Sequence, residues 1–284
     1  CNGKGRSNRR TTFMKGGRAV NELLKLEITA GIGVITLNRP EGFNAFHASM
    51  IADLAEKLIT LHTRKDVVGV VLTGAGKAFC AGADLKWLNT CGTSPGAALH
   101  GLAAAYHQAI LEIRRMPKPV VAAINGLAAG GGFSMALACD FRVMDQSAVL
   151  RQAYTSNGLS VDGGGTYTLP RLVGLARAME ILAFDRPISA GQALTWGLVT
   201  EVVENGQALG RAMNMVREIT KLPLSSFLAS KKLLTDSFHT PFEHQLEKER
   251  EFLSWCADHP NGQEGINAFL EKRTPLYNRK EPGA

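Results

Sequence analysis

Two apolar segments rich in β-branched residues, each followed by a glycine-rich stretch, limit the fold of this chain most strongly. Residues 67–72 read VVGVVL and residues 120–124 read VVAAI. Neither segment alternates with polar residues, which is typical of strands buried on both faces of a sheet. Between them, residues 97–115 have the spacing of a long helix. Strands separated by helices predict right-handed crossovers and a largely parallel sheet, so we expect an α/β fold.

The sequence on either side extends this prediction. Residues 24–29 and 33–37 predict a hairpin turned at Ala30-Gly31, and residues 47–62 predict a helix. After about residue 200, helical spacing continues over residues 208–221, 224–238, 241–257 and 262–272. We therefore expect three parts: a basic leader over residues 1–20, a core over residues 21–200 and a helical C-terminal region over residues 201–284.

The net charge of +7 is concentrated at the beginning of the chain. Residues 1–20 hold six basic residues and no acidic one, so the remainder carries only about +1 (7 − 6). The body therefore gives no electrostatic reason to expect nucleic acid as a partner. We predict a cytoplasmic protein, with an organellar matrix as the alternative if the basic leader is a transit peptide.

The five cysteines are widely spaced and form neither a CxxC pair nor a Cys/His cluster with zinc-ligand spacing. This favours a reducing compartment and gives no reason to expect a metal. The most apolar segment, residues 120–139, is interrupted by Asn125-Gly126 and by the glycines at 130–132. It predicts a buried strand, a loop and a buried helix, and no membrane span.

Two glycine-rich loops follow the buried strands: GKAFCAGADL at residues 76–85 and NGLAAGGGFS at residues 125–134. Each alone is typical of a tight strand-to-helix turn, but small residues also let backbone N–H groups approach a ligand. The second loop is not a phosphate loop, a dinucleotide fingerprint or a GxSxG nucleophile elbow, since Ala136 follows Ser134 at the second position. Two such loops together predict two converging N–H donors, as in an oxyanion hole.

The motifs GKAFCAGADL and AAINGLAAGGGFSMALACD resemble the paired oxyanion-hole motifs of the crotonase (enoyl-CoA hydratase/isomerase) superfamily. The likeness runs from about Leu24 to Tyr277 and includes LNRPEGFNA and GLVTEVV. It implies a spiral of ββα turns with a C-terminal helical trimerisation region. It also implies an acyl-CoA thioester substrate, no cofactor beyond the coenzyme A of that substrate, and a homotrimer or hexamer.

The resemblance implies a set of site residues. The N–H groups of Ala83 and Gly131 would bind the thioester oxygen, and backbone contacts of residues 39–45 and 81–85 would hold coenzyme A. The substrate-binding residues implied in this way are Gly42, Ala45, Ala81, Ala83, Asp84, Leu85, Gly131, Ser134 and Tyr154.

The residues available for acid–base chemistry bear on the reaction. Hydratases of the superfamily carry two glutamates, and this sequence has Ser134 and Tyr154 at those positions. Neither replaces a carboxylate base at neutral pH, because an ordinary Tyr titrates at about 10 and Ser far higher. Asp162, in AYTSNGLSVDGGGTYTLPRLVG, is the acid that remains. This stretch resembles the Asp-dependent Δ3,Δ2-enoyl-CoA isomerases of the epoxyphenylacetyl-CoA isomerase type, in which the matching Asp is the acid/base.

Several alternatives stay open. Asp before Gly is also a turn signal, and Asp before a helix is a common N-cap, so Asp162 has a structural interpretation as well. The protein could instead be a hydratase with an atypical base, or an epoxide-ring isomerase that uses the same Asp. It could also be a non-catalytic homologue that binds acyl-CoA or RNA. Apolar residues expected to line the acyl pocket are Phe133, Leu159, Val161, Phe242 and Phe252.

Other polar side chains are given less specific roles. Asp140 and Arg171 are expected to be structural. Lys231 is expected either near a coenzyme A phosphate or on a solvated helix face. His100 and His107 share one helix face at seven-residue spacing, which more often means packing or solvent contact than ligation.

Overall fold

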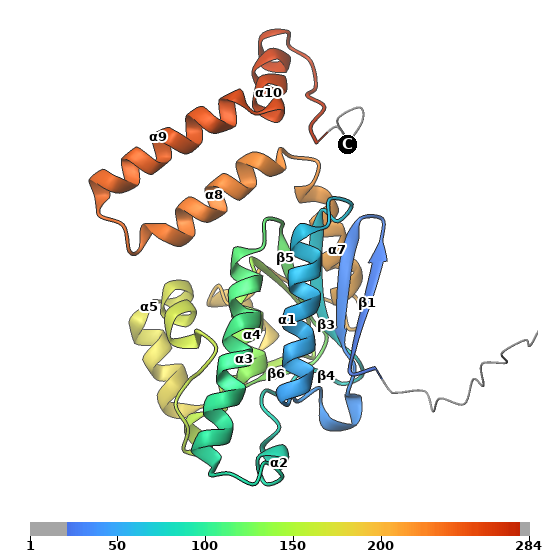
Figure 1. The fold of residues 1–284 in the computed structure, drawn as a ribbon, viewed down its shortest axis with the longest axis vertical. Coiled ribbons are helices and arrows are strands. Elements are labelled where there is room, and N and C mark those ends of the chain that lie inside the picture. Colours follow the sequence, from blue (N-terminus) through green and yellow to red (C-terminus); the bar gives the residue numbers. More distant parts are fainter. Residues whose placement is uncertain (1–21, 279–284) are drawn as a thin grey trace, which may run out of the picture.

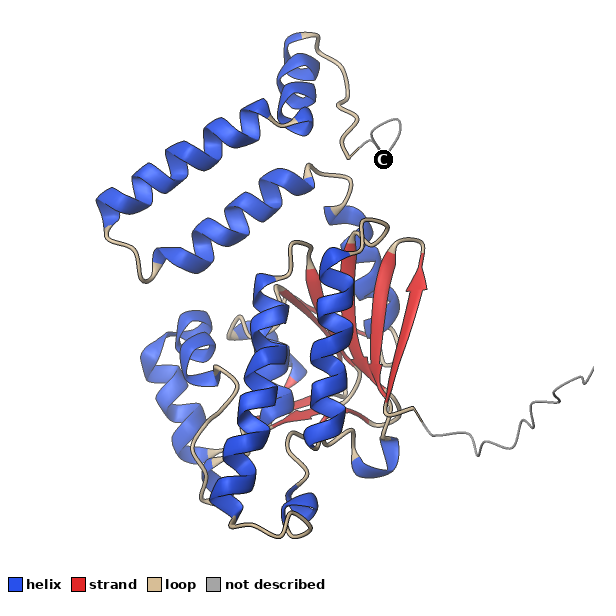
Figure 2. Cartoon of the chain, viewed as in Figure 1, coloured by secondary structure: helices blue, strands red, loops and turns tan. Residues whose placement is uncertain are grey.

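The computed structural model describes residues 22–278, so the basic leader predicted over residues 1–20 lies outside the described part of the chain. Two sheets and the helices around them form the body (Figures 1 and 2). The larger sheet has the order β1-β2-β3-β5-β7-β10 and the smaller has the order β4-β6-β8-β9. β1 is antiparallel to β2, and the other neighbours in the larger sheet are parallel.

Consecutive strands divide between the two sheets. β3, β5 and β7 enter the larger sheet, and β4, β6 and β8, which follow them directly, enter the smaller one. This repeat is the spiral of ββα turns that was predicted, and the α/β fold class is confirmed. The strands of the larger sheet are β1 (Leu24–Thr29), β2 (Ile32–Leu37), β3 (Gly69–Gly74), β5 (Val120–Ile124), β7 (Phe141–Asp145) and β10 (Glu201–Val203). Those of the smaller sheet are β4 (Ala78–Cys80), β6 (Leu127–Ala129), β8 (Val149–Arg151) and β9 (Ile188–Ser189).

The central strands are apolar throughout because both faces of the larger sheet are buried. Val70 and Leu72 point to one core, shared with α1 (Ala48–Thr63) and α3 (Pro95–Arg115). Val71 between them points to a second core, which α7 (Ala208–Ile219) covers. Alternating side chains thus serve two cores, which explains the unbroken β-branched run.

The remaining helices of the body connect and cover these strands. Predicted helices at residues 47–62 and 97–115 are confirmed as α1 and α3, and the hairpin is confirmed as β1 and β2. The short helices are η1 (Pro40–Gly42), α2 (Leu85–Leu88), α4 (Gly131–Ala138), η2 (Thr155–Asn157) and α6 (Ala190–Thr195). The longer α5 (Gly165–Phe184) has 20 residues and a kink at Gly174. Over the described residues, no helix is both long and apolar enough to cross a membrane.

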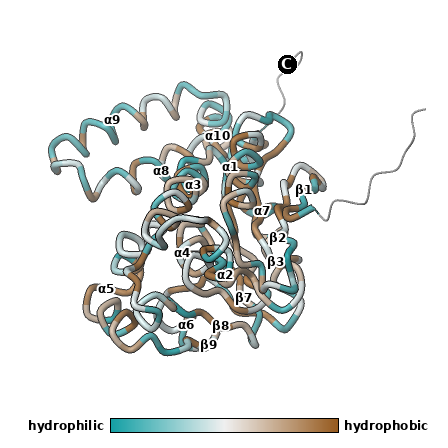
Figure 3. Tube along the Cα trace, turned by 60° about the horizontal axis from the view of Figure 1, so that its bottom comes forward, coloured by the Kyte–Doolittle hydropathy of each residue, from teal (hydrophilic) through white to brown (hydrophobic). Residues whose placement is uncertain are grey.

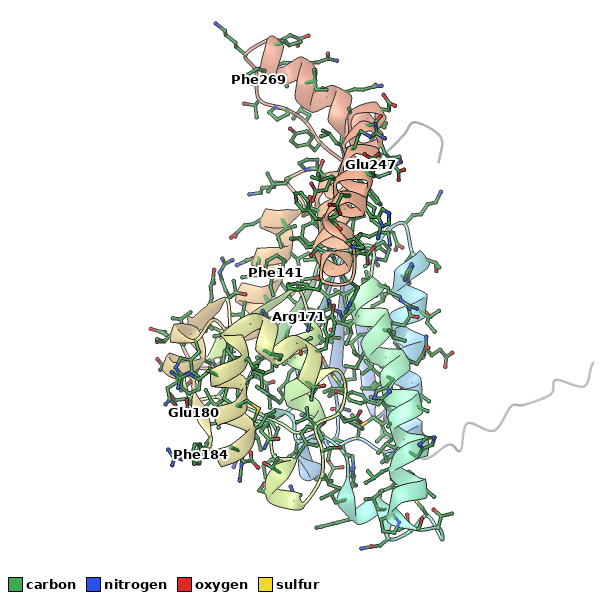
Figure 4. All side chains as sticks on the ribbon, turned by 90° about the vertical axis from the view of Figure 1, so that its left-hand side faces the viewer. Phe141, Arg171, Glu180, Phe184, Glu247 and Phe269 are labelled. Atoms are coloured by element: carbon green, nitrogen blue, oxygen red, sulfur yellow. The ribbon has the colours of Figure 1, made fainter. Side chains whose placement is uncertain are left out.

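The last three helices extend away from the sheets as an arm (Figure 1). The arm consists of α8 (Leu224–Ser237), α9 (Phe242–Asp258) and α10 (Pro260–Leu270). Hydrophilic residues dominate α9, with hydrophobic ones at intervals (Figure 3). In Figure 4, Phe269 lies at the far end of the arm, whereas Phe141 and Arg171 lie where the arm meets the body. β10 and α7, which also follow residue 200, belong to the sheet layers instead.

A buried ion pair joins the arm to the body. The Lys231 ammonium of α8 lies 2.7 Å from a carboxylate oxygen of Asp140 and donates to the carbonyls of Met116 and Lys118. Its side chain is only 11% exposed. Both expectations for Lys231, a phosphate contact and a solvated helix face, are therefore wrong, because the Asp140 carboxylate and two carbonyls take up its charge. Asp140 also accepts the Val120 N–H, which fits the structural role expected for it.

Candidate active site

A cavity of about 400 Å³ lies between α3, the loop after β4, the beginning of α4 and the segment that precedes α5. Most of the residues predicted to form the site line this cavity, although they lie up to 81 positions apart in the sequence. The predicted residues that line the cavity are Ala81, Ala83, Leu85, Gly131, Tyr154 and Asp162. Most of the other lining residues are apolar, so the cavity suits a hydrophobic acyl group with a polar end.

The first wall of the cavity is built from backbone. Every peptide bond of the described chain is trans, so a C=O and the N–H of the same peptide point in opposite directions. The Gly82 carbonyl accepts the Phe46 N–H at 2.8 Å, which turns the Ala83 N–H away from Phe46. The Gly130 carbonyl accepts the Ser134 N–H in the first turn of α4, which turns the Gly131 N–H out of the helix. Neither N–H has an acceptor within residues 22–278, so both are available to a ligand oxygen.

Glycines make this close approach possible. A Cβ on Gly82 would lie 2.8 Å from the Gly131 nitrogen, and Gly82 itself has φ +89°. A Cβ on Gly132 would lie 2.0 Å from the Cys80 carbonyl oxygen. The two loops therefore touch through glycine backbone, and the distance between their N–H groups is set by residues without side chains.

The beginning of α4 adds to the electrostatic preference of this wall. All eight residues of α4 are buried, and Gly131 is the first of them. The unpaired N–H groups at a helix N-terminus carry partial positive charge, which favours an oxygen that gains negative charge. The Tyr106 hydroxyl of α3 donates to the Gly131 carbonyl, and its ring stacks on Phe46 at 4.8 Å. These contacts fix the position of the backbone at Gly131.

The second wall presents one carboxylate. Among residues 22–278, Asp162 is the only acidic residue that lines the cavity, and its side chain is 35% exposed. Its Oδ1 lies 2.5 Å from Nε2 of His107, on α3, while Oδ2 has no hydrogen-bond partner among the residues that the structure describes. His107 is half-exposed, as the expected solvent contact implies, but it also pairs with a cavity carboxylate, which was not predicted. The histidine spacing on α3 was visible, but nothing local pointed to a partner 55 residues away.

The glycines after Asp162 serve the turn and the helix start. Gly163 has φ +64°, and a Cβ there would lie 2.4 Å from the Tyr106 ring. Gly164, with φ +74°, caps α5, and Gly165 is its first residue. These glycines let the chain turn tightly against α3 directly after Asp162, so the carboxylate is held by packed backbone.

Ser134 and Tyr154 are the residues that the resemblance placed at the glutamate positions of hydratases. The Ser134 hydroxyl is fully buried and does not line the cavity. The Tyr154 hydroxyl is also buried. The Ser134 hydroxyl and the Asp162 N–H lie near its oxygen, although within the described chain neither hydroxyl oxygen makes a hydrogen bond of regular geometry. Burial raises the pKa of Tyr154 well above its ordinary value, so its phenol stays protonated at neutral pH. Neither side chain supplies a base.

The loop at residues 39–45 is fastened to the first wall by Arg39. Its guanidinium lies 2.7 Å from the Asp84 carboxylate and donates to the Ala45 carbonyl at 2.9 Å. Asp84 also accepts two N–H groups as the N-cap of α2. Burial opposes ionisation of Asp84, but Arg39 and these N–H groups lower its pKa overall. Asp84, Gly42 and Ala45 do not line the cavity, so their contact with coenzyme A stays a prediction.

The expected apolar lining is confirmed for Leu159 and Val161. Phe133 is buried in the main core and does not line the cavity. Phe242 is 71% exposed on the arm, and Phe252, also on the arm, is absent from the lining as well. The arm helices of the same chain therefore contribute none of the cavity lining. No group of three or more His, Cys, Asp or Glu within residues 22–278 is arranged to hold a metal ion.

Comparison with known proteins agrees with this geometry. The chain is 34% identical over 261 residues to the 1,2-epoxyphenylacetyl-CoA isomerase of Escherichia coli, covering 91% of this chain and 99% of that protein. It is 35% identical over 256 residues to the (E)-benzylidenesuccinyl-CoA hydratase of Thauera aromatica, covering 89% and 97%. A crystal structure of an enoyl-CoA hydratase from Polaromonas aligns with a TM-score of 0.85 at 36% identity, covering 90% of this chain and 99% of that one. The sequence model that describes enoyl-CoA hydratases and isomerases matches residues 27–280. Because that match spans almost the whole chain, the protein belongs to the enoyl-CoA hydratase/isomerase family.

Proposed function

We propose that the protein moves the double bond of an enoyl-CoA from Δ3 to Δ2, with Asp162 as the proton shuttle. The observation that carries this proposal is that one carboxylate, and no second one, lines a cavity that also presents the N–H groups of Ala83 and Gly131. The likeness to 1,2-epoxyphenylacetyl-CoA isomerase supports an isomerase.

The proposed reaction uses only these three groups. The substrate carbonyl oxygen accepts the N–H groups of Ala83 and Gly131, which makes the protons on C2 more acidic. Asp162 takes one of these protons, and the electron pair of the broken C–H bond delocalises into a dienolate whose negative charge lies mainly on the thioester oxygen. The carboxylic acid then returns the proton to C4 and is ionised again. No water is added, so one carboxylate suffices.

Hydration is the runner-up, because several relatives are named hydratases. Addition of water needs one group to activate the water and a route for delivering a proton to the α-carbon. Besides Asp162, the ionisable groups that line the cavity are His100, Tyr106 and Tyr154. Burial keeps both phenols protonated, so His100 of α3 is the group that a hydratase would have to use beside Asp162. An epoxide-ring isomerase with the same Asp, or a non-catalytic acyl-CoA-binding protein, would also use this cavity.

The isomerase proposal is tested with purified protein and 3-hexenoyl-CoA, following the absorbance of the conjugated 2-enoyl thioester. Asp162→Asn is expected to lower kcat by roughly 10²- to 10⁴-fold, the usual contribution of a general acid–base group. Glu27→Gln is the matched control, since it also turns an acid into an amide but lies exposed on β1. Full turnover by Asp162→Asn would show that another group moves the proton.

We also infer that the arm forms contacts between copies of this chain in a homotrimer or hexamer. The arm exposes large apolar side chains, including Phe242, Leu253, Phe269 and Leu270, and such surface is usually covered in a stable assembly. A monomer mass at micromolar concentration in sedimentation would contradict this inference.

A further inference from the structure

We propose that His107 is a positioning residue for Asp162: it binds Oδ1, so that the shuttled proton is taken and returned by Oδ2. This inference rests on the proposed isomerase function and goes beyond it, because it assigns a role to a residue outside the cavity lining. It is carried by the 2.5 Å contact between His107 Nε2 and Asp162 Oδ1.

The direction of this hydrogen bond follows from the chemistry of the carboxylate. An ionised carboxylate can only accept hydrogen bonds, so Nε2 of His107 carries the hydrogen when Asp162 is ready to act as a base. Oδ1 is then occupied by that N–H. Oδ2, which has no partner in the described part of the chain, is the oxygen left for a substrate proton.

The same bond remains possible after the proton is transferred. With the proton on Oδ2, Oδ1 is a carbonyl oxygen and still accepts the His107 N–H. His107 therefore keeps the carboxyl group in one orientation during both halves of the reaction. Without it, the protonated side chain could rotate about its Cβ–Cγ bond and move the proton on Oδ2 away from C4 of the substrate.

Helix α3 connects this contact to the first wall. Tyr106, the residue before His107, donates to the Gly131 carbonyl and packs against Gly163, the residue after Asp162. Two consecutive residues of one helix thus contact the donor loop, the backbone beside the carboxylate and the carboxylate itself. The ionisable groups that face Asp162 are His107 and Tyr106 from α3 and Tyr154 from the segment before η2.

If His107 contributed only to stability, its replacement would lower the thermal midpoint and leave kcat of the folded enzyme unchanged. The His107 side chain is 52% exposed, and exposed ion pairs contribute little to stability. Replacement of His107 should therefore change the thermal midpoint very little. A positioning role predicts a loss in kcat, because misplacing a catalytic group by about 1 Å can cost about 100-fold.

The test compares wild type with His107→Leu, His107→Gln and Gln108→Leu, using 3-hexenoyl-CoA. We expect His107→Leu to lower kcat by roughly 10- to 100-fold with KM changed less than about threefold. His107→Gln keeps an N–H donor on a shorter side chain and should recover part of this loss. Gln108→Leu is the matched control, because Gln108 is exposed on the same helix and bonds only to Glu112.

The decisive step repeats His107→Leu in the Asp162→Asn background. If His107 acts through Asp162, the double variant turns over at the same rate as Asp162→Asn alone. An additional loss of the same size in both backgrounds, or unchanged kcat in His107→Leu, would overturn the proposal. These outcomes differ from failure of the proposed function, in which wild type itself would not isomerise 3-hexenoyl-CoA or Asp162→Asn would remain active.

Discussion

The two walls of the cavity are built in opposite ways. The wall that offers the N–H groups of Ala83 and Gly131 is backbone, and glycines hold its two loops so close together that an added Cβ would collide with main-chain atoms. The opposite wall offers one side chain, Asp162, whose carboxylate is oriented by a single contact with a half-exposed histidine. The N–H donors of the first wall are thus fixed by many backbone contacts, whereas the Asp162 side chain is oriented by one hydrogen bond.

This difference explains how one fold serves several reactions. Every reaction that develops charge on a thioester oxygen needs the backbone wall, so its geometry cannot change without loss of the fold's common chemistry. The side-chain wall can change by single substitutions, and the resemblance implies such a change at Tyr154, which lines the cavity where hydratases are expected to carry glutamate. Relatives of similar identity that are named isomerase and hydratase fit this account.

The largest effect is expected when one methyl group is added to the backbone wall. Gly82→Ala should lower kcat by roughly 10²- to 10³-fold, because the new Cβ pushes on the Gly131 nitrogen and displaces one oxyanion donor. The control is Gly92→Ala, where φ is also positive, at +65°, but no atom lies within 4 Å of the added Cβ. Equal loss in both variants would mean that backbone strain, and not crowding of the donors, limits activity.

A second variant separates catalysis from stability. Lys231→Met removes the cation from the buried Asp140 carboxylate and should lower the free energy of unfolding by about 3 kcal/mol. For a chain of this length that corresponds to a thermal midpoint about 6–12 °C lower. Turnover of the folded enzyme should stay near wild type, because the pair lies outside the cavity lining.

The neighbouring residue provides the control for this variant. Lys232 is 61% exposed, and its pair with Asp236 lies on the helix surface. Lys232→Met should therefore leave the midpoint almost unchanged. If both variants melted alike, the Asp140 pair would not be the contact that holds the arm to the body.

The smallest expected effect concerns Tyr154 on the side-chain wall. Tyr154→Phe deletes a buried hydroxyl that makes no hydrogen bond of regular geometry in the described chain, so stability should stay within about 1 kcal/mol of wild type. Isomerisation should remain within about twofold of wild type, because the proposed mechanism does not use the phenol. A large drop in kcat would assign Tyr154 a part in the reaction and would favour a two-group mechanism.

The backbone wall was predictable from the sequence, and the side-chain wall only in part. Loops of small residues after buried strands are a local pattern that predicted two N–H donors, and the resemblance to the crotonase superfamily implied that these are Ala83 and Gly131. Asp162 was found because the glutamate positions hold other residues. The contact with His107 depends on how α3 lies against the segment before α5, and no short-range pattern records that packing.

Two other features of the structure were not predicted, because they too depend on packing or on segments too short to show a pattern. The strands of the smaller sheet, such as β4 and β6, have three residues each, too few for a periodic pattern to appear. The position of Lys231 depends on where α8 meets the body, and the spacing of apolar residues within α8 contains no information about that contact.

The proposal that this cavity favours isomerisation over hydration rests on one carboxylate beside two N–H donors, with no second carboxylate in the lining that residues 22–278 provide. It is tested most directly by giving the purified wild-type protein 3-hexenoyl-CoA and 2-hexenoyl-CoA in parallel and measuring kcat/KM for both conversions. The account predicts that conversion of the 3-enoyl to the 2-enoyl thioester is faster than formation of the 3-hydroxyacyl thioester. Hydration of 2-hexenoyl-CoA that is faster than isomerisation of 3-hexenoyl-CoA would contradict it.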